Sequence, residues 1–330
     1  MTRTFTLSCS GPAAFPLDLA HELNDAQRAA VTCGNGPKLV IAGAGSGKTR
    51  TITYRVAYLM ARGVLPAQIL LATFTNKAAR EMLARVEALT GHTLTGLVGG
   101  TFHAIGNRLL RAHGARVGLA PNYSILDEED SRVLLKACVA DAKVQVEAKR
   151  FPAPAILRNL FSMAFNTQRP LAAIVEERTP HFAMWTELIE AIRTRYTTKK
   201  RSANVVDYDD LLRFWLALVE DCPDITQHLG EQLHYLLIDE YQDTNTIQAR
   251  VVERISEHNG RNLMVVGDDA QCVMQGTRIL TPNGETVVER LCVGDHVLAG
   301  AGTGRLIPER VRVLQRAEPP RYVVIGVQGG

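Results

Sequence analysis

The sequence lacks the features that mark membrane, secreted and zinc-bound proteins. Its six cysteines are scattered and form no Cys-x-x-Cys pair, which excludes a disulfide framework or a zinc site of that kind and favours a reducing compartment. No apolar run reaches the ~18 residues that a membrane span needs. The N-terminus also lacks the apolar core of a signal peptide. We therefore expect a cytoplasmic protein with no membrane partner.

A strong charge imbalance is also absent. The formal net charge of the 330 residues is +3, which is too small to argue for nucleic-acid binding, so such a function must be inferred from motifs. A basic cluster does occur between Arg193 and Arg201, where a solvated helix end and a phosphate-binding patch are both open alternatives. The hydrophobic fraction of 46% is ordinary for a globular protein, and the length suits about two domains.

Short apolar runs alternate with helical patterns after a weakly patterned extension over residues 1–20. The runs Lys38–Ile41 and Ile69–Thr73 read as buried strands, and the helical patterns follow at Lys48–Met60 and Lys77–Leu89. This alternation predicts an α/β domain with a parallel sheet.

The middle of the chain has a different character. Residues 107–204 carry helical periodicity and few strand runs, which predicts a helical subdomain inserted into the α/β domain. Buried-strand runs return at Leu233–Ile238 and Asn262–Val266 and should join the same sheet. We therefore expect a P-loop domain built from residues 21–106 and 205–271.

A glycine-rich segment lies between the first predicted strand and the helix that follows it. This is the context of a Walker A loop, whose backbone N–H groups and helix N-terminus bind phosphates. Lys48 should meet the β- and γ-phosphates of ATP, and the hydroxyl of Thr49 should bind Mg²⁺. Where the strict motif begins with Gly, this loop has Ala, which is also small. The predicted loop residues are Ala42, Gly43, Ala44, Gly45, Ser46, Gly47, Lys48 and Thr49.

An acidic pair ends the strand-like run Leu233–Ile238. Asp239 would hold Mg²⁺ through water, and Glu240 would orient and deprotonate the attacking water. Asp-Glu alone is a weak signal, but together with the Walker A loop it predicts ATP hydrolysis.

Six motifs follow one another over residues 20–271. In chain order they are Leu23–Gln27, Ala42–Arg50, Thr73–Ala79, Gly100–His103, Asp239–Asn245 and Val266–Gln271. This series resembles the UvrD/Rep/PcrA group of superfamily 1 DNA helicases. The resemblance implies a RecA-like motor that hydrolyses ATP, moves 3′→5′ along single-stranded or partly duplex DNA, and serves repair or replication.

The same resemblance implies roles for four further side chains at the ATP site. Gln27 stands where the family reads adenine, and an amide can donate to and accept from the adenine edge at once. Arg50 matches an arginine near the base. Gln242 and Gln271 match glutamines that sense the γ-phosphate and couple it to DNA.

Two of the motifs should contact DNA. Phe74 follows a strand end, where an aromatic ring can stack on an unpaired base for ~1–3 kcal/mol per base. Core packing is the alternative for Phe74 and also for Phe102. The predicted DNA contacts are Thr73, Phe74, Thr75, Asn76, Thr101, Phe102 and His103.

The helicase pattern breaks at Cys272, and β-rich sequence follows. A hairpin signal centres on Asn283 and Gly284. The segment resembles the N-terminal splicing motif of an intein, carried by Gly276, Thr277, Ile279, Thr281, Gly284 and the run from Gly294 to Leu298. That resemblance implies an incomplete all-β, Hint-like segment over residues 272–330. Cys272 would then attack the carbonyl of Gln271 and form a thioester.

We therefore expect the N-terminal half of a helicase, carried as an intein-containing precursor. Its partner would be a C-terminal helicase–intein half, without which the chain should bind ATP and single strands but unwind negligibly. Two alternatives stay open. One is an inactive nucleotide-binding gene remnant, and the other is a helicase–nuclease subunit of the RecB/AddA kind.

Overall fold

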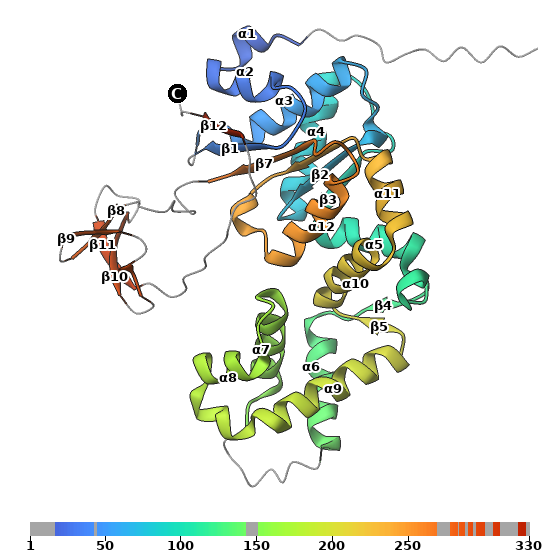
Figure 1. Ribbon diagram of the computed structural model, residues 1–330, viewed down its shortest axis with the longest axis vertical. Coiled ribbons are helices and arrows are strands. Elements are labelled where there is room, and N and C mark those ends of the chain that lie inside the picture. Colours follow the sequence, from blue (N-terminus) through green and yellow to red (C-terminus); the bar gives the residue numbers. More distant parts are fainter. Residues whose placement is uncertain are drawn as a thin grey trace, which may run out of the picture.

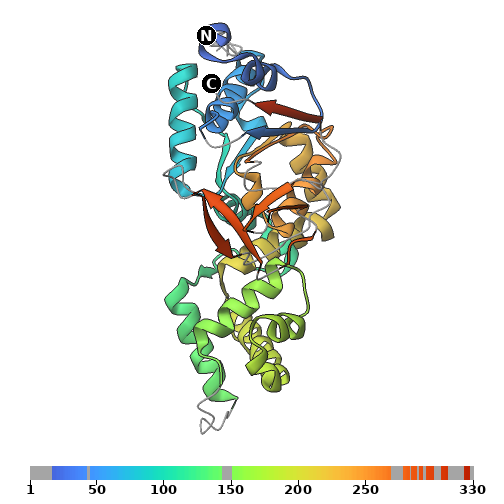
Figure 2. The ribbon, with the colours of Figure 1, turned by 90° about the vertical axis from the view of Figure 1, so that its left-hand side faces the viewer.

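The computed structural model has an α/β part and a helical part that extends away from it, and two views at 90° show the same division (Figures 1 and 2). Among the described residues no helix is long and apolar enough to cross a membrane. The structure describes residues 17–42, 45–142, 151–268, 278–282, 284–287, 290–292, 295–300, 306–310 and 323–327.

A six-stranded parallel sheet forms the centre of the α/β part, in the order β12-β1-β7-β6-β2-β3. Five of its strands come from the first 271 residues, which confirms the predicted parallel α/β fold and is consistent with a RecA-like domain. The strands are β1 (Lys38–Ala42), β2 (Ile69–Thr73), β3 (Val98–Thr101), β6 (Tyr235–Ile238), β7 (Leu263–Gly267) and β12 (Val323–Val327).

Both faces of the sheet are covered, because successive strand residues enter opposite core clusters. Leu70 and Leu236 pack into one cluster with Trp215, whereas Leu71 and Leu237 pack into the other. Continuous apolar runs in strands are typical of parallel sheets buried on both sides. The covering helices are α2 (Asp25–Thr32), α3 (Lys48–Ala61) and α4 (Asn76–Thr90) on one face, and α5 (Phe102–His113), α10 (Tyr208–Asp221), α11 (Pro223–Gln232) and α12 (Thr246–Ser256) on the other.

Short elements complete the α/β part. They are α1 (Leu19–Glu22) and the 3-10 turns η1 (Pro66–Gln68), η2 (Gly114–Val117) and η4 (Tyr241–Asp243).

Four α-helices and one 3-10 turn form the described helical part and share a core of their own, which includes Leu135, Leu157 and Ile189. We call α6 to α9 the helical subdomain. Its entry and exit strands, β4 (Ser124–Ile125) and β5 (Val205–Val206), pair in parallel. The elements are α6 (Glu128–Asp141), α7 (Pro154–Asn166), α8 (Leu171–Arg178), η3 (Pro180–Trp185) and α9 (Thr186–Ser202).

The described residues beyond 277 form strands. The hairpin predicted around Gly284 is present, because β8 (Arg278–Thr281) pairs antiparallel with β9 (Gly284–Val287), and Gly284 has a φ of +110°. A second antiparallel pair joins β10 (His296–Gly300) to β11 (Leu306–Arg310). These pairings are β structure, but they do not by themselves establish an intein fold.

One C-terminal strand departs from the expected separate all-β segment. β12 pairs in parallel with β1, with Lys38 opposite Val323 and Ala42 opposite Val327. Without β12, β1 would be the edge of the sheet next to β7, and an edge strand presents unpaired backbone N–H and C=O groups. A β-prone Val-Val-Ile run satisfies those groups, so this strand extends the α/β sheet.

Candidate functional site

Two predicted ATP-site residues and one further acidic residue lie at the carboxyl ends of three adjacent strands. Lys48 begins the helix that follows β1, Asp239 directly follows β6, and Asp268 directly follows β7. Ligands of open α/β sheets bind at this edge. The sheet order β1-β7-β6 therefore brings together side chains that are far apart in the chain.

The described part of the P-loop is shaped by two glycines in the left-handed region. Gly45 and Gly47 have φ values of +78° and +85°. A Cβ on Gly47 would lie 2.6 Å from Nε2 of Gln27, so no larger residue fits there without a shift. Gly47 is also the N-cap of α3 and has no side chain to cover the helix N-terminus, which suits phosphate binding. The predicted loop residues Gly43 and Ala44 lie outside the described residues.

Gln27 is buried beside the P-loop. Its Nε2 donates to the carbonyl oxygen of Ser46 at 2.8 Å, and its Oε1 accepts from the backbone N–H of Asn24 at 3.1 Å. In this geometry Gln27 ties helix α2 to the loop. Its predicted adenine contact stays a prediction.

Lys48 is held by an acidic side chain that the sequence analysis did not assign to the site. Its Nζ lies 2.8 Å from Oδ2 of Asp268, and the two side chains are only 11% and 4% exposed. Lys48 also donates to the carbonyl oxygen of Ala42 at 3.3 Å. The signal that could have found Asp268 is its position, because it follows a strand adjacent to the P-loop strand. Phosphates entering the loop would compete with this carboxylate.

Asp239 is a buried carboxylate suited to a cation. It is 3% exposed, and within the described structure its Oδ1 has no hydrogen-bond partner. Burial, and then the neighbouring Glu240 carboxylate, raise the pKa of Asp239 to about 6, while Lys48 opposes the shift. An unpaired buried oxygen of this kind fits a metal ligand. Mg²⁺ is bound through one or two carboxylates together with phosphate oxygens and water, so Asp239 and Thr49 fit it.

Gln242 joins the acidic motif to the segment after β7. Its Nε2 donates to Oε2 of Glu240 at 2.6 Å, and its Oε1 accepts from the backbone N–H of Asp268 at 3.0 Å. Glu240 itself has a φ of +52°, an uncommon value for a residue with a side chain, and such strain clusters at functional sites.

Arg50 lies in the first turn of α3, and its side chain reaches α1. It forms an ion pair with Glu22, whose carboxylate also accepts from the Tyr54 hydroxyl at 3.2 Å. The Arg50 guanidinium lies 5.5 Å from the centre of the Tyr54 ring. Both Arg50 and Glu22 are half-exposed, so the guanidinium stands where a base could reach it.

The predicted DNA contacts start from two neighbouring strand ends, because Thr73 on β2 is the register partner of Thr101 on β3. The Phe74 side chain is 60% exposed, and the first helical residue, Asn76, is exposed as well. The Thr75 hydroxyl caps α4 by accepting from the N–H of Ala78. These residues form an exposed turn beyond the sheet.

The second strand end differs, because its first two predicted DNA contacts are buried. Thr101 is buried and its hydroxyl accepts from the N–H of Ala104, so it caps α5. Phe102 is 5% exposed and its ring lies 6.1 Å from that of Trp215 in the core. This position favours core packing, the alternative given above for Phe102, and its DNA contact stays a prediction. Thr73, at the end of β2, is likewise buried, and its DNA contact and that of Thr101 stay predictions.

His103 is partly buried beside an aromatic neighbour that the sequence analysis did not assign to the site. Its ring packs edge-on against Tyr208 at 5.5 Å, and Tyr208 is 53% exposed. An aromatic residue at the first position of a helix that returns from an insertion is the signal that could have found Tyr208.

The basic cluster of α9 is largely neutralised. Arg193 pairs with Glu190, Lys199 with Asp141, and Lys200 with the carboxylates of Asp207 and Asp210 at the start of α10. The solvated or paired helix end is therefore favoured over a phosphate patch.

Gln271 and Cys272 lie outside the described residues.

Comparison with known proteins agrees with this geometry. The family model of the UvrD/REP helicase N-terminal domain matches residues 23–275. The ATP-dependent DNA helicase PcrA of Leuconostoc citreum is 35% identical over 257 residues, which cover 77% of this chain and 33% of that protein. PcrA of Bacillus subtilis (strain 168) is 36% identical over 252 residues, or 76% of this chain and 33% of the relative. The chain thus spans about a third of the length of these relatives. It belongs to the UvrD/REP helicase family and contains that family's N-terminal domain.

Proposed function

We propose that this chain carries the P-loop half of the ATP site, and part of the DNA track, of a 3′→5′ helicase that moves along single-stranded DNA in repair or replication. The observation that carries the proposal is the buried group Lys48, Asp268 and Asp239 at the carboxyl edge of the sheet. The relatives named above are described as ATP-dependent DNA helicases, which supports the same activity here.

The chemistry follows from the positions of these groups. Lys48 would exchange the Asp268 carboxylate for the β- and γ-phosphates. Thr49 and Asp239 would hold Mg²⁺, which neutralises phosphate charge when bound. Glu240 would orient the attacking water as general base, and Gln242, which already bridges Glu240 and Asp268, would respond to the γ-phosphate. Gln271 is proposed for the same sensing role from its motif alone.

The proposed DNA track starts at the exposed turn after β2. Phe74 offers an open ring for base stacking, and Asn76 offers hydrogen bonds to phosphates. Tyr208, packed on His103, is a second exposed ring near the neighbouring strand end. Single-stranded DNA is the substrate that such rings favour, because its bases are unstacked.

Nucleotide binding by the intact chain tests the proposal. Fluorescence of an ATP analogue with Mg²⁺ should show saturable binding that Lys48→Ala weakens at least about tenfold, since a buried charge partner of phosphate is worth more than ~1.4 kcal/mol. Arg158→Ala, which removes a surface ion pair on α7, is the matched control. Failure of the intact chain to bind would contradict the proposal and favour the inactive remnant.

Unwinding is proposed to require a C-terminal helicase half as partner. A helicase–nuclease subunit of the RecB/AddA kind has the same motifs and is the alternative for the full machine. Nuclease activity of the assembled protein on linear duplex DNA would favour that alternative, whereas unwinding without degradation would favour a PcrA-like helicase.

We propose self-processing at Cys272 as a second function. The β8–β9 hairpin with its Gly284 turn supports the intein-like motif, whereas the pairing of β12 with β1 departs from it. The Cys272 thiolate would attack the Gln271 carbonyl and break the Gln271–Cys272 amide. A thioester would form and the Cys272 amino group would be released. Excess thiol should then cleave the chain after Gln271, and Cys272→Ala should prevent it. An uncleaved wild-type chain would contradict the proposal.

A further inference from the structure

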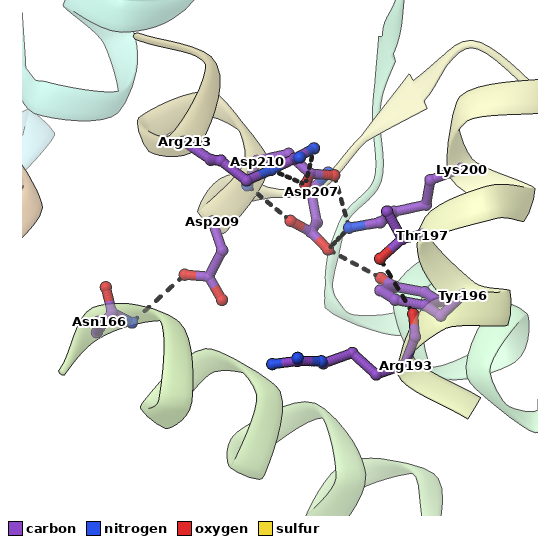
Figure 3. Close-up of polar contacts among 9 residues, drawn as sticks. All are labelled: Asn166, Arg193, Tyr196, Thr197, Lys200, Asp207, Asp209, Asp210 and Arg213. Atoms are coloured by element: carbon purple, nitrogen blue, oxygen red, sulfur yellow. Dashed lines mark hydrogen bonds and ion pairs between the residues drawn. The ribbon is translucent and has the colours of Figure 1, made fainter. Parts of the chain in front are cut away.

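Two polar junctions connect the helical subdomain to the α/β part, and they differ in chemistry. Both meet α10, which follows the exit strand β5. Figure 3 shows Lys200 facing Asp207, the N-cap of α10, and Asp210 in the first turn of that helix. Asp209 of the same turn points the other way, toward Asn166.

The first junction is a buried ionic cluster. Nζ of Lys200 lies 2.5 Å from Oδ2 of Asp207 and 2.6 Å from Oδ2 of Asp210. The Tyr196 hydroxyl donates to Oδ2 of Asp207 at 3.0 Å, and Arg213 pairs with Asp210. Removing one member of a buried ion pair is strongly destabilising. This junction therefore stabilises the attachment of α9 to α10 and is a poor candidate for a moving contact.

The second junction is a bridge of neutral amides. Asn166 is the last residue of α7, and its Oδ1 accepts from Nδ2 of Asn245 at 2.8 Å. Its own Nδ2 donates to Oγ of Ser162 at 3.0 Å and lies 3.4 Å from Oδ1 of Asp209. A partly buried amide pair is weak enough to form and break within a reaction cycle.

Asn245 connects this bridge to the ATP site. It caps α12 by accepting from the N–H of Gln248, and it follows the η4 turn that contains Gln242. Gln242 in turn binds Glu240 and the backbone of Asp268, whose carboxylate holds Lys48. Displacement of Asp268 by phosphate would thus move the segment on which Asn245 stands.

We propose that Asn166 is a positioning residue that transmits the state of the nucleotide site to the helical subdomain through its hydrogen bond with Asn245. The proposal rests on the proposed ATP binding. Phosphate at Lys48 releases Asp268 and shifts the η4 turn, and the shift loosens the Asn245–Asn166 bridge. The end of α7 then becomes freer relative to α10, while the Lys200 cluster keeps α9 in place.

Hydrogen exchange of the intact chain, with and without a slowly hydrolysed ATP analogue and Mg²⁺, tests this idea. The amides at the C-terminal end of α7 should exchange about fivefold faster when nucleotide is bound, which corresponds to the ~1 kcal/mol of one neutral hydrogen bond. In Asn166→Ala the same amides should exchange fast in both conditions. The amides of Ile189 and Ile192 in α9 should not respond.

Asn245→Ser gives the sharper variant, because serine still caps a helix but has no amide to reach Asn166. It should abolish the nucleotide-dependent difference in the amide exchange rate of α7, as Asn166→Ala does. The double variant should exchange at the same rates as either single variant. Arg158→Ala, on the same helix but outside the bridge, should behave like wild type. Fluorescence of the ATP analogue verifies nucleotide binding separately. If the chain binds nucleotide and α7 shows no rise, or an equal rise in Asn166→Ala, the proposal is overturned.

Discussion

At the scale of the residue, burial separates side chains that occupy equivalent places in their motifs. Phe74 and Phe102 each follow one of two register-paired threonines, Thr73 and Thr101. Phe74 projects from a turn and is 60% exposed, whereas Phe102 begins a helix and packs on Trp215 at 5% exposure. An exposed ring can bind a ligand, and a buried ring contributes packing.

Alanine substitution should separate the two roles. Phe74→Ala should weaken binding of a fluorescent oligothymidylate by ~1–3 kcal/mol for the lost stacked base and leave the unfolding midpoint unchanged. Phe102→Ala should lower the free energy of unfolding by about 3–5 kcal/mol, because it removes a buried ring. Urea titration and anisotropy measure the two quantities. Destabilisation by Phe74→Ala, with DNA affinity intact, would reverse the assignment.

His103 predicts a pH dependence of stability. Burial lowers the pKa of this imidazole below its ordinary value of 6.5. Between the two pKa values the unfolded chain binds a proton that the folded chain does not, so the free energy of unfolding falls as pH decreases below 6.5 toward the folded-state pKa. Urea titrations at about pH 7.5 and about pH 5.5 should show a smaller loss in His103→Gln than in wild type. Equal losses would contradict this account.

At the scale of the element, strand order decides which motifs meet. β1, β7 and β6 are neighbours in the sheet, so their carboxyl ends bring Lys48, Asp268 and Asp239 to one edge. The helical subdomain is attached differently, through β5, α10 and the Lys200 cluster. Phe165 of α7 also packs against the core on one face of the sheet, so the position of the subdomain relative to the sheet depends on a few polar contacts and on this apolar contact.

Lys200→Met should weaken that attachment. The substitution removes the ammonium group that pairs with the partly buried Asp207 and the buried Asp210, while Asp210 keeps its pair with Arg213, and it should cost up to about 3–5 kcal/mol in the free energy of unfolding. Arg158→Ala breaks an ion pair whose side chains are 35% and 71% exposed, and it should cost less than about 1 kcal/mol. Chemical denaturation followed by circular dichroism compares the two. An equally small effect in Lys200→Met would show that the cluster is not a structural joint.

At the scale of the whole molecule, ligand binding should stabilise the part that forms the site. The helical subdomain has its own core, and the P-loop belongs to the core of the sheet. Two cores joined by only a few contacts can respond unequally to the same ligand.

Saturation with an ATP analogue and Mg²⁺ should raise the free energy of unfolding of the α/β part by about 2.7 kcal/mol at 100 times the dissociation constant. Lys48→Ala should lose this gain at the same ligand concentration. Differential scanning calorimetry with and without ligand measures the effect. An upward shift of equal size in Lys48→Ala would show that the stabilisation does not come from the P-loop site.

Local patterns in the sequence determined the P-loop, the acidic pair, the alternation of strands and helices and the family resemblance, because each is carried by a few consecutive residues. Only the tertiary structure decided which of the motif side chains are buried, and which distant groups meet. The Lys48–Asp268 pair spans 220 positions and the Asn166–Asn245 bridge spans 79. Such contacts depend on strand order and helix packing, which periodicity does not encode. The place of β12 beside β1 was missed for the same reason, because the sequence of a strand does not determine which other strand it pairs with.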